Sequence, residues 1–267
     1  MNVLMKQARL RVIVPVLLSL GMSTAANAAD VHVLATGALR GAFRSIVPAF
    51  EQSTGDKLIV SWGPSYGTSP DDLPMRLKKR EPMDVCFMIG AALDDQIRQG
   101  YFAPDTRANV AISRIGLAVR RGLPKPDIGS VDAVRAALLG AKSVAFSEGA
   151  SGRYVTETLF PKLGIAEAMK GKIVQIKGKE LVGTALEHGE ADVGLQQISE
   201  LRAIDGIQYV GPLPDSLQKV SVIAAAVGRN AAEPEAARAL IRYLQTPAAK
   251  QLLEASGLDP ADRGSQK

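Results

Sequence analysis

The sequence predicts an α/β fold with largely parallel sheets. β-rich runs and helical segments alternate along the chain with short connections, as in sheets whose parallel strands are joined by helices. Three strand-to-helix junctions, at 36–38, 63–69 and 147–152, are rich in Gly, Ser or Thr. The free N–H groups of a helix start point past the end of the preceding strand, so such junctions suit a backbone-lined anion site.

Hydrophobic periodicity gives the elements in order. The predicted strands are 31–35, 58–62, 84–89, 115–119, 143–146, 173–176, 192–195 and 220–227, the last expected to be buried along its whole length. The predicted helices are 42–50, 73–79, 93–99, 131–138, 152–163, 180–188, 235–244 and 248–255. Ser130 is expected to cap the helix at 131–138, and Pro247 and Gly257 to begin and end the last one.

Residues 1–28 have the features of a cleaved secretory signal peptide. Three cations (Lys6, Arg9 and Arg11) precede an apolar run at 12–20, and Ala26-Asn27-Ala28 has the small-x-small pattern of a cleavage site. The apolar run is well short of the roughly 20 residues that span a bilayer. No Cys lies at the cleavage site to carry a lipid. We therefore expect export to the periplasm without a membrane anchor.

Composition argues against a nucleic-acid partner. The 267 residues are 46% hydrophobic and 22% charged, and the formal net charge is +5. Without the three leader cations, 29 basic residues face 27 acidic ones, so the balance falls to +2. Nucleic-acid binding needs basic residues clustered on one face. The nearest cluster, at 76–80, is better explained as a solvated helix end.

Residues that carry metal, cofactor or nucleophile chemistry are scarce. Cys86, the only cysteine, lies in an apolar strand and is expected to be a buried thiol. His32 and His188 are expected to be structural or exposed. No metal-ligand cluster, Ser-His-Asp order or phosphate-binding loop is present. We expect no metal and no cofactor.

Motifs in a consistent order resemble the periplasmic molybdate-binding proteins, a family of type 2 periplasmic solute-binding proteins. The matching segments are Val33 to Leu39, Pro48 to Glu51, Thr54-Gly55, Glu81-Pro82-Met83-Asp84-Val85, Gln99 to Phe102, Ser151-Gly152-Arg153-Tyr154 and Gly189 to Gly194. The resemblance implies a monomer of two α/β lobes, each a largely parallel sheet flanked by helices, joined by two crossover strands. Lobe 1 would comprise 29–112 and 222–267, and lobe 2 would comprise 113–221. A small anion would bind between them, for delivery to an ABC permease.

The resemblance also implies a set of ligand-binding positions. Carried over one by one, these positions fall at Thr36, Gly37, Ala38, Arg40, Ser65, Ser151, Arg153, Lys179 and Gln197. Ala38 stands where the family has a Ser, and Gln197 where it has a Tyr, while Arg40 and Lys179 add formal charge. Arg suits planar carboxylates, so we expect an organic di- or tricarboxylate rather than molybdate. The alternative is that both cations extend into solvent.

An enzyme of similar fold and size, periplasmic aconitate isomerase, provides a second interpretation. That reaction moves a proton and a double bond in a tricarboxylate without a cofactor, and it needs cationic clamps and an acid–base group. The candidate clamps are Arg40, Lys179, Arg114 and Arg153, and the candidate proton-transfer groups are Glu148 and Tyr66. The alternative to these catalytic roles is structural: Arg153 would brace its helix, and Glu148 would cap the same helix. The sequence leaves both functions open, with binding first.

Overall fold

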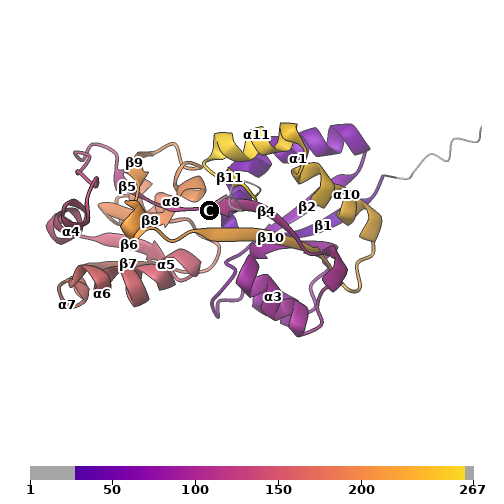
Figure 1. The fold of residues 1–267 in the computed structure, drawn as a ribbon, viewed down its shortest axis with the longest axis horizontal. Helices are drawn as coiled ribbons and strands as arrows, with labels where there is room; N and C mark the ends of the chain where they lie inside the picture. The colour runs from indigo at the N-terminus through magenta and orange to yellow at the C-terminus, as the bar shows by residue number, and fades with distance from the viewer. Residues whose placement is uncertain (1–27, 262–267) are drawn as a thin grey trace, which may run out of the picture.

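The computed structural model describes residues 28–261, and two sheets organise them (Figure 1). The first sheet has the order β11-β4-β10-β3-β1-β2 and the second the order β7-β6-β8-β5-β9. The first contains β1 (Asp30–Ala35), β2 (Lys57–Trp62), β3 (Val85–Ile89), β4 (Ala108–Ser113), β10 (Ser221–Val227) and β11 (Asp259–Pro260). The second contains β5 (Ile115–Arg120), β6 (Val144–Ser147), β7 (Ile173–Ile176), β8 (Val193–Gln197) and β9 (Ile207–Pro212). The predicted signal peptide lies outside the described residues, apart from its last position.

Most strands within each sheet run in one direction. In the first sheet β1, β2, β3 and β4 run one way, while β10 and β11 oppose them. In the second, only β5 runs against the other four strands. The predicted α/β architecture with two lobes is confirmed. Two of the opposed strands, β5 and β10, each begin directly after a passage between the lobes.

Helices cover both sheets. Lobe 1 carries α1 (Arg40–Thr54), α2 (Leu73–Lys78), α3 (Gly90–Arg98), α10 (Pro234–Leu244) and α11 (Pro247–Ser256), with short 3-10 turns η1 (Gly37–Leu39) and η2 (Pro104–Thr106). Lobe 2 carries α4 (Val131–Gly140), α5 (Ala150–Tyr154), the π-helical η3 (Val155–Leu159), α6 (Phe160–Leu163), α7 (Ala166–Met169), α8 (Val182–Glu187), α9 (Ile198–Leu201) and the 3-10 turn η4 (Asp215–Leu217). Within the described residues, no helix combines the length and apolarity needed to cross a lipid bilayer.

Separate apolar cores stabilise the two lobes. One cluster fills lobe 1 around Phe43, Phe87 and Ile223, and two clusters pack on the faces of the second sheet. Cys86 is fully buried in β3, as predicted, and burial raises the pKa of its thiol. Ser130 caps α4 by accepting a hydrogen bond from the N–H of Ala133.

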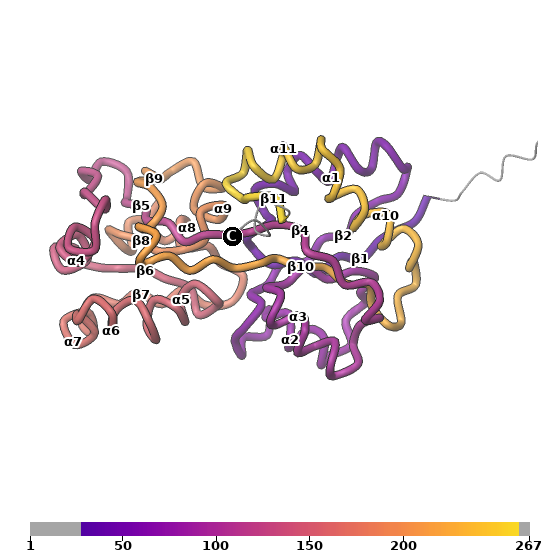
Figure 2. Tube along the Cα trace, viewed as in Figure 1, coloured from indigo at the N-terminus to yellow at the C-terminus, as the bar shows by residue number. Residues whose placement is uncertain are grey.

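The chain crosses between the lobes twice (Figure 2). It passes from β4 to β5 through Arg114 and returns from β9 to β10 through residues 213–220. Gln218 ties the two crossings together, because its side chain accepts from the N–H of Ile115 at 2.7 Å and donates to the carbonyl of Ile115 at 3.0 Å. The crossings agree with the lobes predicted from the resemblance, although the predicted boundaries themselves stay a prediction.

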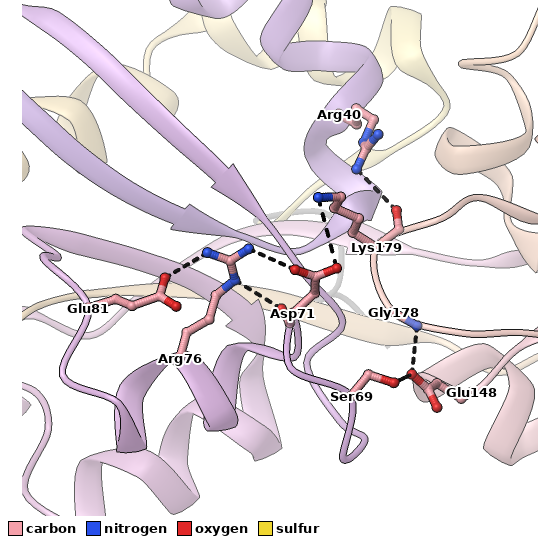
Figure 3. Close-up of polar contacts among 8 residues, drawn as sticks. All are labelled: Arg40, Ser69, Asp71, Arg76, Glu81, Glu148, Gly178 and Lys179. Atoms are coloured by element: carbon pink, nitrogen blue, oxygen red, sulfur yellow. Dashed lines mark hydrogen bonds and ion pairs between the residues drawn. The ribbon is translucent and has the colours of Figure 1, made fainter.

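Some local predictions need correction. The strand at 220–227 is not buried along its whole length, since Val220 and Val222 are 47% and 36% exposed. The helix expected at 152–163 is interrupted by the π-helical turn η3. The basic run at 76–80 does not begin in solvent, because the Arg76 guanidinium lies between Asp71 at 3.2 Å and Glu81 at 2.7 Å (Figure 3).

A glycine sets the tight turn between β6 and α5. A Cβ at Gly152 would lie 1.4 Å from the carbonyl oxygen of Ser147, a position no side chain can occupy. We predict that Gly152→Ala destabilises the protein by about 3 kcal/mol or more, because the turn must move to admit the methyl group. Gly140→Ala, at a helix position with nothing within 4 Å, is the matched control. It should be neutral or stabilising by about 0.5–1 kcal/mol. Urea denaturation measures both, and an equal effect of the two changes would contradict the packing argument.

Candidate functional site

One cavity lies where the two lobes meet, at the carboxyl ends of six strands. Its lining falls within segments 36–40, 63–65 and 89 of lobe 1, and 147–151, 178–181 and 196–200 of lobe 2. These segments follow or end β1, β2, β3, β6, β7 and β8. The open space is about 30 Å³, above the roughly 10–15 Å³ that one water requires. Parallel strands bring these segments together, because their carboxyl ends share one sheet edge.

Serine hydroxyls supply neutral donors to the cavity. The Ser65 oxygen accepts a hydrogen bond from the N–H of Ile89 at 3.0 Å, so its own hydrogen remains for another acceptor. Across the cavity, the hydroxyls of Ser147 and Ser151 lie 3.2 Å apart at the start of α5. All three side chains are buried. This set of donors suits an anion better than a cation.

Two buried glutamines offer their amide nitrogens. The side-chain oxygen of Gln196 accepts from the N–H of Val182 at 2.8 Å, and that of Gln197 accepts from the Ser113 hydroxyl at 2.6 Å. Since each oxygen is engaged, the NH₂ group is what each side chain has left to offer. The second of these bonds also joins β4 of lobe 1 to β8 of lobe 2, so Gln197 couples the site to the closed arrangement of the lobes.

Arg40 lines the cavity instead of extending into solvent. Its guanidinium donates to the carbonyl of Lys179 at 3.2 Å and lies 5.3 Å from the centre of the Trp62 ring (Figure 3). Its Nε is buried without a hydrogen-bond partner among the described residues. Burial lowers the pKa of Arg40, although the neighbouring Glu200 carboxyl opposes the change; the guanidinium remains a cation. An unpaired buried donor is costly, and a ligand carboxylate would satisfy it.

Lys179 takes part in the site through its main-chain carbonyl more than through its ammonium group. Its carbonyl accepts from Arg40, while its ammonium is half exposed and lies 3.9 Å from Asp71 at the rim (Figure 3). Lys179 also lines the cavity, as do Thr36 and Gly37. The two cations therefore differ, because Arg40 is held inside the site and the Lys179 ammonium stands at its edge.

Glu200, Ser147 and Gln196 line the cavity but are not among the predicted binding residues, and Glu200 is the buried carboxyl of this group. It is only 8% exposed, and a Cβ at Gly37 would lie 2.3 Å from its Oε1, so the carboxyl lies directly against Gly37. Glu200 is the third residue of α9, and Gln197 directly precedes that helix. The N–H of Gln197 donates a hydrogen bond to the Glu200 carboxyl, as in a capping box. Burial raises the pKa of Glu200 to about 7, although Arg40 and the Gln197 N–H oppose this. The sequence did contain one signal for this residue, because a Glu three positions after the residue that precedes a helix is typical of a capping box.

Several predicted site residues lie outside this cavity. Ala38 is fully buried in the core of lobe 1. The Arg153 guanidinium lies 5.2 Å from the centre of the Tyr66 ring, and both residues line a separate groove between the lobes. Arg114 forms an ion pair with Asp259 at 3.0 Å. The roles predicted for Thr36, Gly37, Arg40, Ser65, Ser151, Lys179 and Gln197, which do line the cavity, stay predictions.

Glu148 links the lobes and does not line the cavity. Its carboxylate accepts from the N–H of Gly178 at 2.7 Å and from the Ser69 hydroxyl of lobe 1 (Figure 3). Arg44 adds another contact between the lobes by donating to the carbonyl of Ala203 at 2.9 Å. Together with the Arg40 bond to Lys179, these contacts hold the lobes in a closed arrangement.

A family model and a long relative match most of the chain. Residues 31–259 match the model described as bacterial extracellular solute-binding protein. A protein of a Pseudomonas species named aconitate isomerase is 42% identical over 228 residues, covering 85% of this chain and 87% of the relative. Molybdate-binding protein ModA of Azotobacter vinelandii is 24% identical over 243 residues, covering 88% of this chain and 92% of the relative.

A solved structure shares the fold. The periplasmic molybdate-binding protein of Azotobacter vinelandii superposes with a TM-score of 0.67 at 19% identity, covering 85% of this chain and 98% of that one. This agreement covers both lobes and the passages between them. The resemblance drawn from the ordered motifs is confirmed.

The contacts of Glu148 lead to a prediction about lobe closure. Glu148→Ala removes the acceptor that Ser69 and Gly178 share, so the ligand-free protein should populate a more open arrangement. Small-angle X-ray scattering should show a larger radius of gyration. Glu157→Ala is the matched control, because its ion pair with Arg153 stays within one helical segment of lobe 2. An unchanged radius for Glu148→Ala would show that this contact does not hold the lobes together.

The raised pKa of Glu200 predicts a pH-dependent stability. Folding raises its pKa from the ordinary 4.5 to about 7, so the folded state binds the proton more tightly and loses stability as pH rises from about 4.5 to about 7. Glu200→Gln does not titrate and should remain stable across this window. At pH 8 the free energy of unfolding of the variant should exceed that of the wild type by up to about 3 kcal/mol. At pH 4.5 the two values should be nearly equal. Urea titrations at several pH values test this, and parallel curves would contradict it.

Proposed function

This chain belongs to the family of bacterial extracellular solute-binding proteins, and we propose that its two lobes close around a small organic polycarboxylate. The observation that carries this proposal is the Arg40 guanidinium, held inside the cavity with a buried, unpaired Nε. A guanidinium pairs with a planar carboxylate through parallel hydrogen bonds. The serine hydroxyls and glutamine amides around it would receive further carboxylates.

The chemistry of the lining favours carboxylates over molybdate. Tetrahedral oxyanions can be held by neutral hydroxyl and backbone donors with the help of helix dipoles. Here the position expected to carry a hydroxyl is Ala38, which is buried in the core, and a formal cation lies within the cavity instead. The 42% identical relative named aconitate isomerase supports a ligand of the tricarboxylate class.

The proposed setting is the periplasm. The family and the leader-like sequence at 1–28 support export. As a transport component, the monomeric protein would deliver its ligand to an ABC permease. The permease would then distinguish the loaded protein by its closed lobes. The ligand would bridge groups from both lobes and so stabilise the closed state over the open one.

Isomerisation of a tricarboxylate is the second candidate function. The buried carboxyl of Glu200 in the cavity favours it, because proton transfer needs a positioned acid–base group and simple anion binding does not. The relative named aconitate isomerase supports the same chemistry. Binding remains the first proposal, since either function requires the polycarboxylate site.

The binding proposal predicts a specific loss on removing Arg40. Arg40→Ala should weaken the binding of trans-aconitate by at least about tenfold, because a charge-assisted pair contributes about 1.5–3 kcal/mol. Arg98→Ala, which removes an exposed guanidinium paired within its own helix, should bind as the wild type does. Calorimetric titration of both variants measures the difference.

Thermal-shift measurements with molybdate, tungstate and tricarboxylates give the outcome that would contradict the proposal. If molybdate or tungstate gives the largest thermal shift and tricarboxylates give none, the carboxylate assignment is wrong. Lys179→Ala should weaken binding less than Arg40→Ala, because its ammonium is at the rim and half exposed. A larger effect of Lys179→Ala would reverse the roles assigned to the two cations.

A further inference from the structure

We propose that Glu200 is the acid–base residue that moves a proton within an unsaturated tricarboxylate held in this cavity. The inference rests on the proposed polycarboxylate site and assigns the isomerase candidate a catalytic residue. It starts from geometry, since Glu200 lies against Gly37 of lobe 1 although it belongs to α9 of lobe 2. The open space of about 30 Å³ admits only about two waters, so a tricarboxylate would enter as the lobes move apart and would then meet this carboxyl directly.

The charges around Glu200 are unevenly distributed. Arg40, on α1, is the cation that acts on its carboxyl. Lys179 and Glu180, on the segment before α8, also line the cavity, but Glu180 is exposed. Glu200 is therefore the buried carboxyl of the lining among the described residues. A bound polyanion would disfavour its ionised form further.

Proton transfer at this position is balanced without a cofactor. The Glu200 carboxylate would remove a proton from the methylene carbon beside the double bond, and the electron pair of that C–H bond would form a new C=C bond. The electron pair of the old double bond would move to the far carbon, which takes up a proton from the Glu200 carboxyl. One C–H bond breaks and another forms, so no oxidant or reductant is needed. Arg40 and the amides of Gln196 and Gln197 would stabilise the negative charge that spreads onto the ligand carboxylates.

The other acid–base candidates are less suitable. Glu148 already accepts hydrogen bonds from Gly178 and Ser69 and lies outside the cavity lining. Tyr66 lines the separate groove, beneath the Arg153 guanidinium. Burial raises the pKa of Glu200 toward neutrality, and an acid–base group works best when its pKa is near the working pH.

The alternative is that Glu200 only caps α9. Glutamine serves at this capping position as well as glutamate does, so Glu200→Gln preserves the cap while removing the acid–base function. Glu167→Gln, at an exposed site on α7 where the carboxylate pairs only with Lys170, is the matched control. These two variants separate a structural role from a chemical one.

The experiment follows trans-aconitate by proton NMR in D₂O and measures its binding by calorimetry in parallel. The wild type should convert the trans to the cis signal and exchange methylene protons for deuterium. Glu200→Gln should lose both activities by at least about 100-fold, the lower end of what an acid–base group contributes. Its affinity should stay within about threefold of the wild type, and Glu167→Gln should match the wild type in all assays.

Other outcomes separate the two proposals. If the wild type binds trans-aconitate without conversion or exchange, the polycarboxylate site stands and the role of Glu200 is overturned. If the wild type binds no polycarboxylate, the proposed function itself fails. If Glu200→Gln keeps its turnover, or loses affinity as much as turnover, Glu200 is not the acid–base residue.

Discussion

The peptide N–H groups where the strands end and the next helices begin need acceptors, and this need constrains the site. Segments that follow or end β1, β2, β3, β6, β7 and β8 meet at one cavity, and a helix or 3-10 turn begins from five of them. The first N–H groups of a helix have no partner within that helix. Where two such edges close on each other, water is displaced and the donors need acceptors from elsewhere. The Gln196 oxygen meets this need for Val182 and the Ser65 oxygen for Ile89, which leaves hydroxyl hydrogens and amide NH₂ groups as the donors for a ligand.

Hydrogen bonds contribute to the contact between the lobes. Each lobe has its own apolar core, so neither needs the other to bury its hydrophobic residues. Between the lobes, the Glu148 carboxylate, the Arg40 guanidinium and the Ser113–Gln197 pair supply hydrogen bonds. Partly exposed polar bonds are individually weak, with a net contribution of about 0.5–1.5 kcal/mol each. A ligand that bonds to both lobes can therefore shift the balance between open and closed states. Gln218 joins the two crossings about which such a movement would occur.

Local sequence patterns predicted most of the fold and part of the candidate site. Periodicity located the core strands and long helices because their apolar faces are set within a few residues of sequence. It missed β4 and β9, which lie at the passages between the lobes, and the four-residue helix α9, which is too short for a period. Arg40 was identified through the family resemblance, whose first matching segment, Val33 to Leu39, directly precedes it. Glu200 was not, because Gly37 and Arg40, distant in sequence, determine its burial. Tyr66 and Glu148 lie outside this cavity, and the sequence could not show this because the path of the loop at 63–72 depends on tertiary contacts; their predicted roles in proton transfer stay predictions.

The electrostatic influence of Arg40 on the buried Glu200 carboxyl is the feature on which the proposed reactivity depends. An ionised carboxylate inside an anion site repels the ligand and incurs a desolvation penalty. A neutral amide at the same place would cap α9 equally well and would donate to the ligand at every pH. A carboxyl is useful there only if both of its protonation states are used, either to read the protonation state of the ligand or to exchange a proton with it. Arg40 makes both states accessible, because its charge offsets part of the burial effect that raises the pKa of Glu200 to about 7. Under the proposed function, this arrangement would suit an anion that exchanges a proton at carbon or oxygen while it is bound.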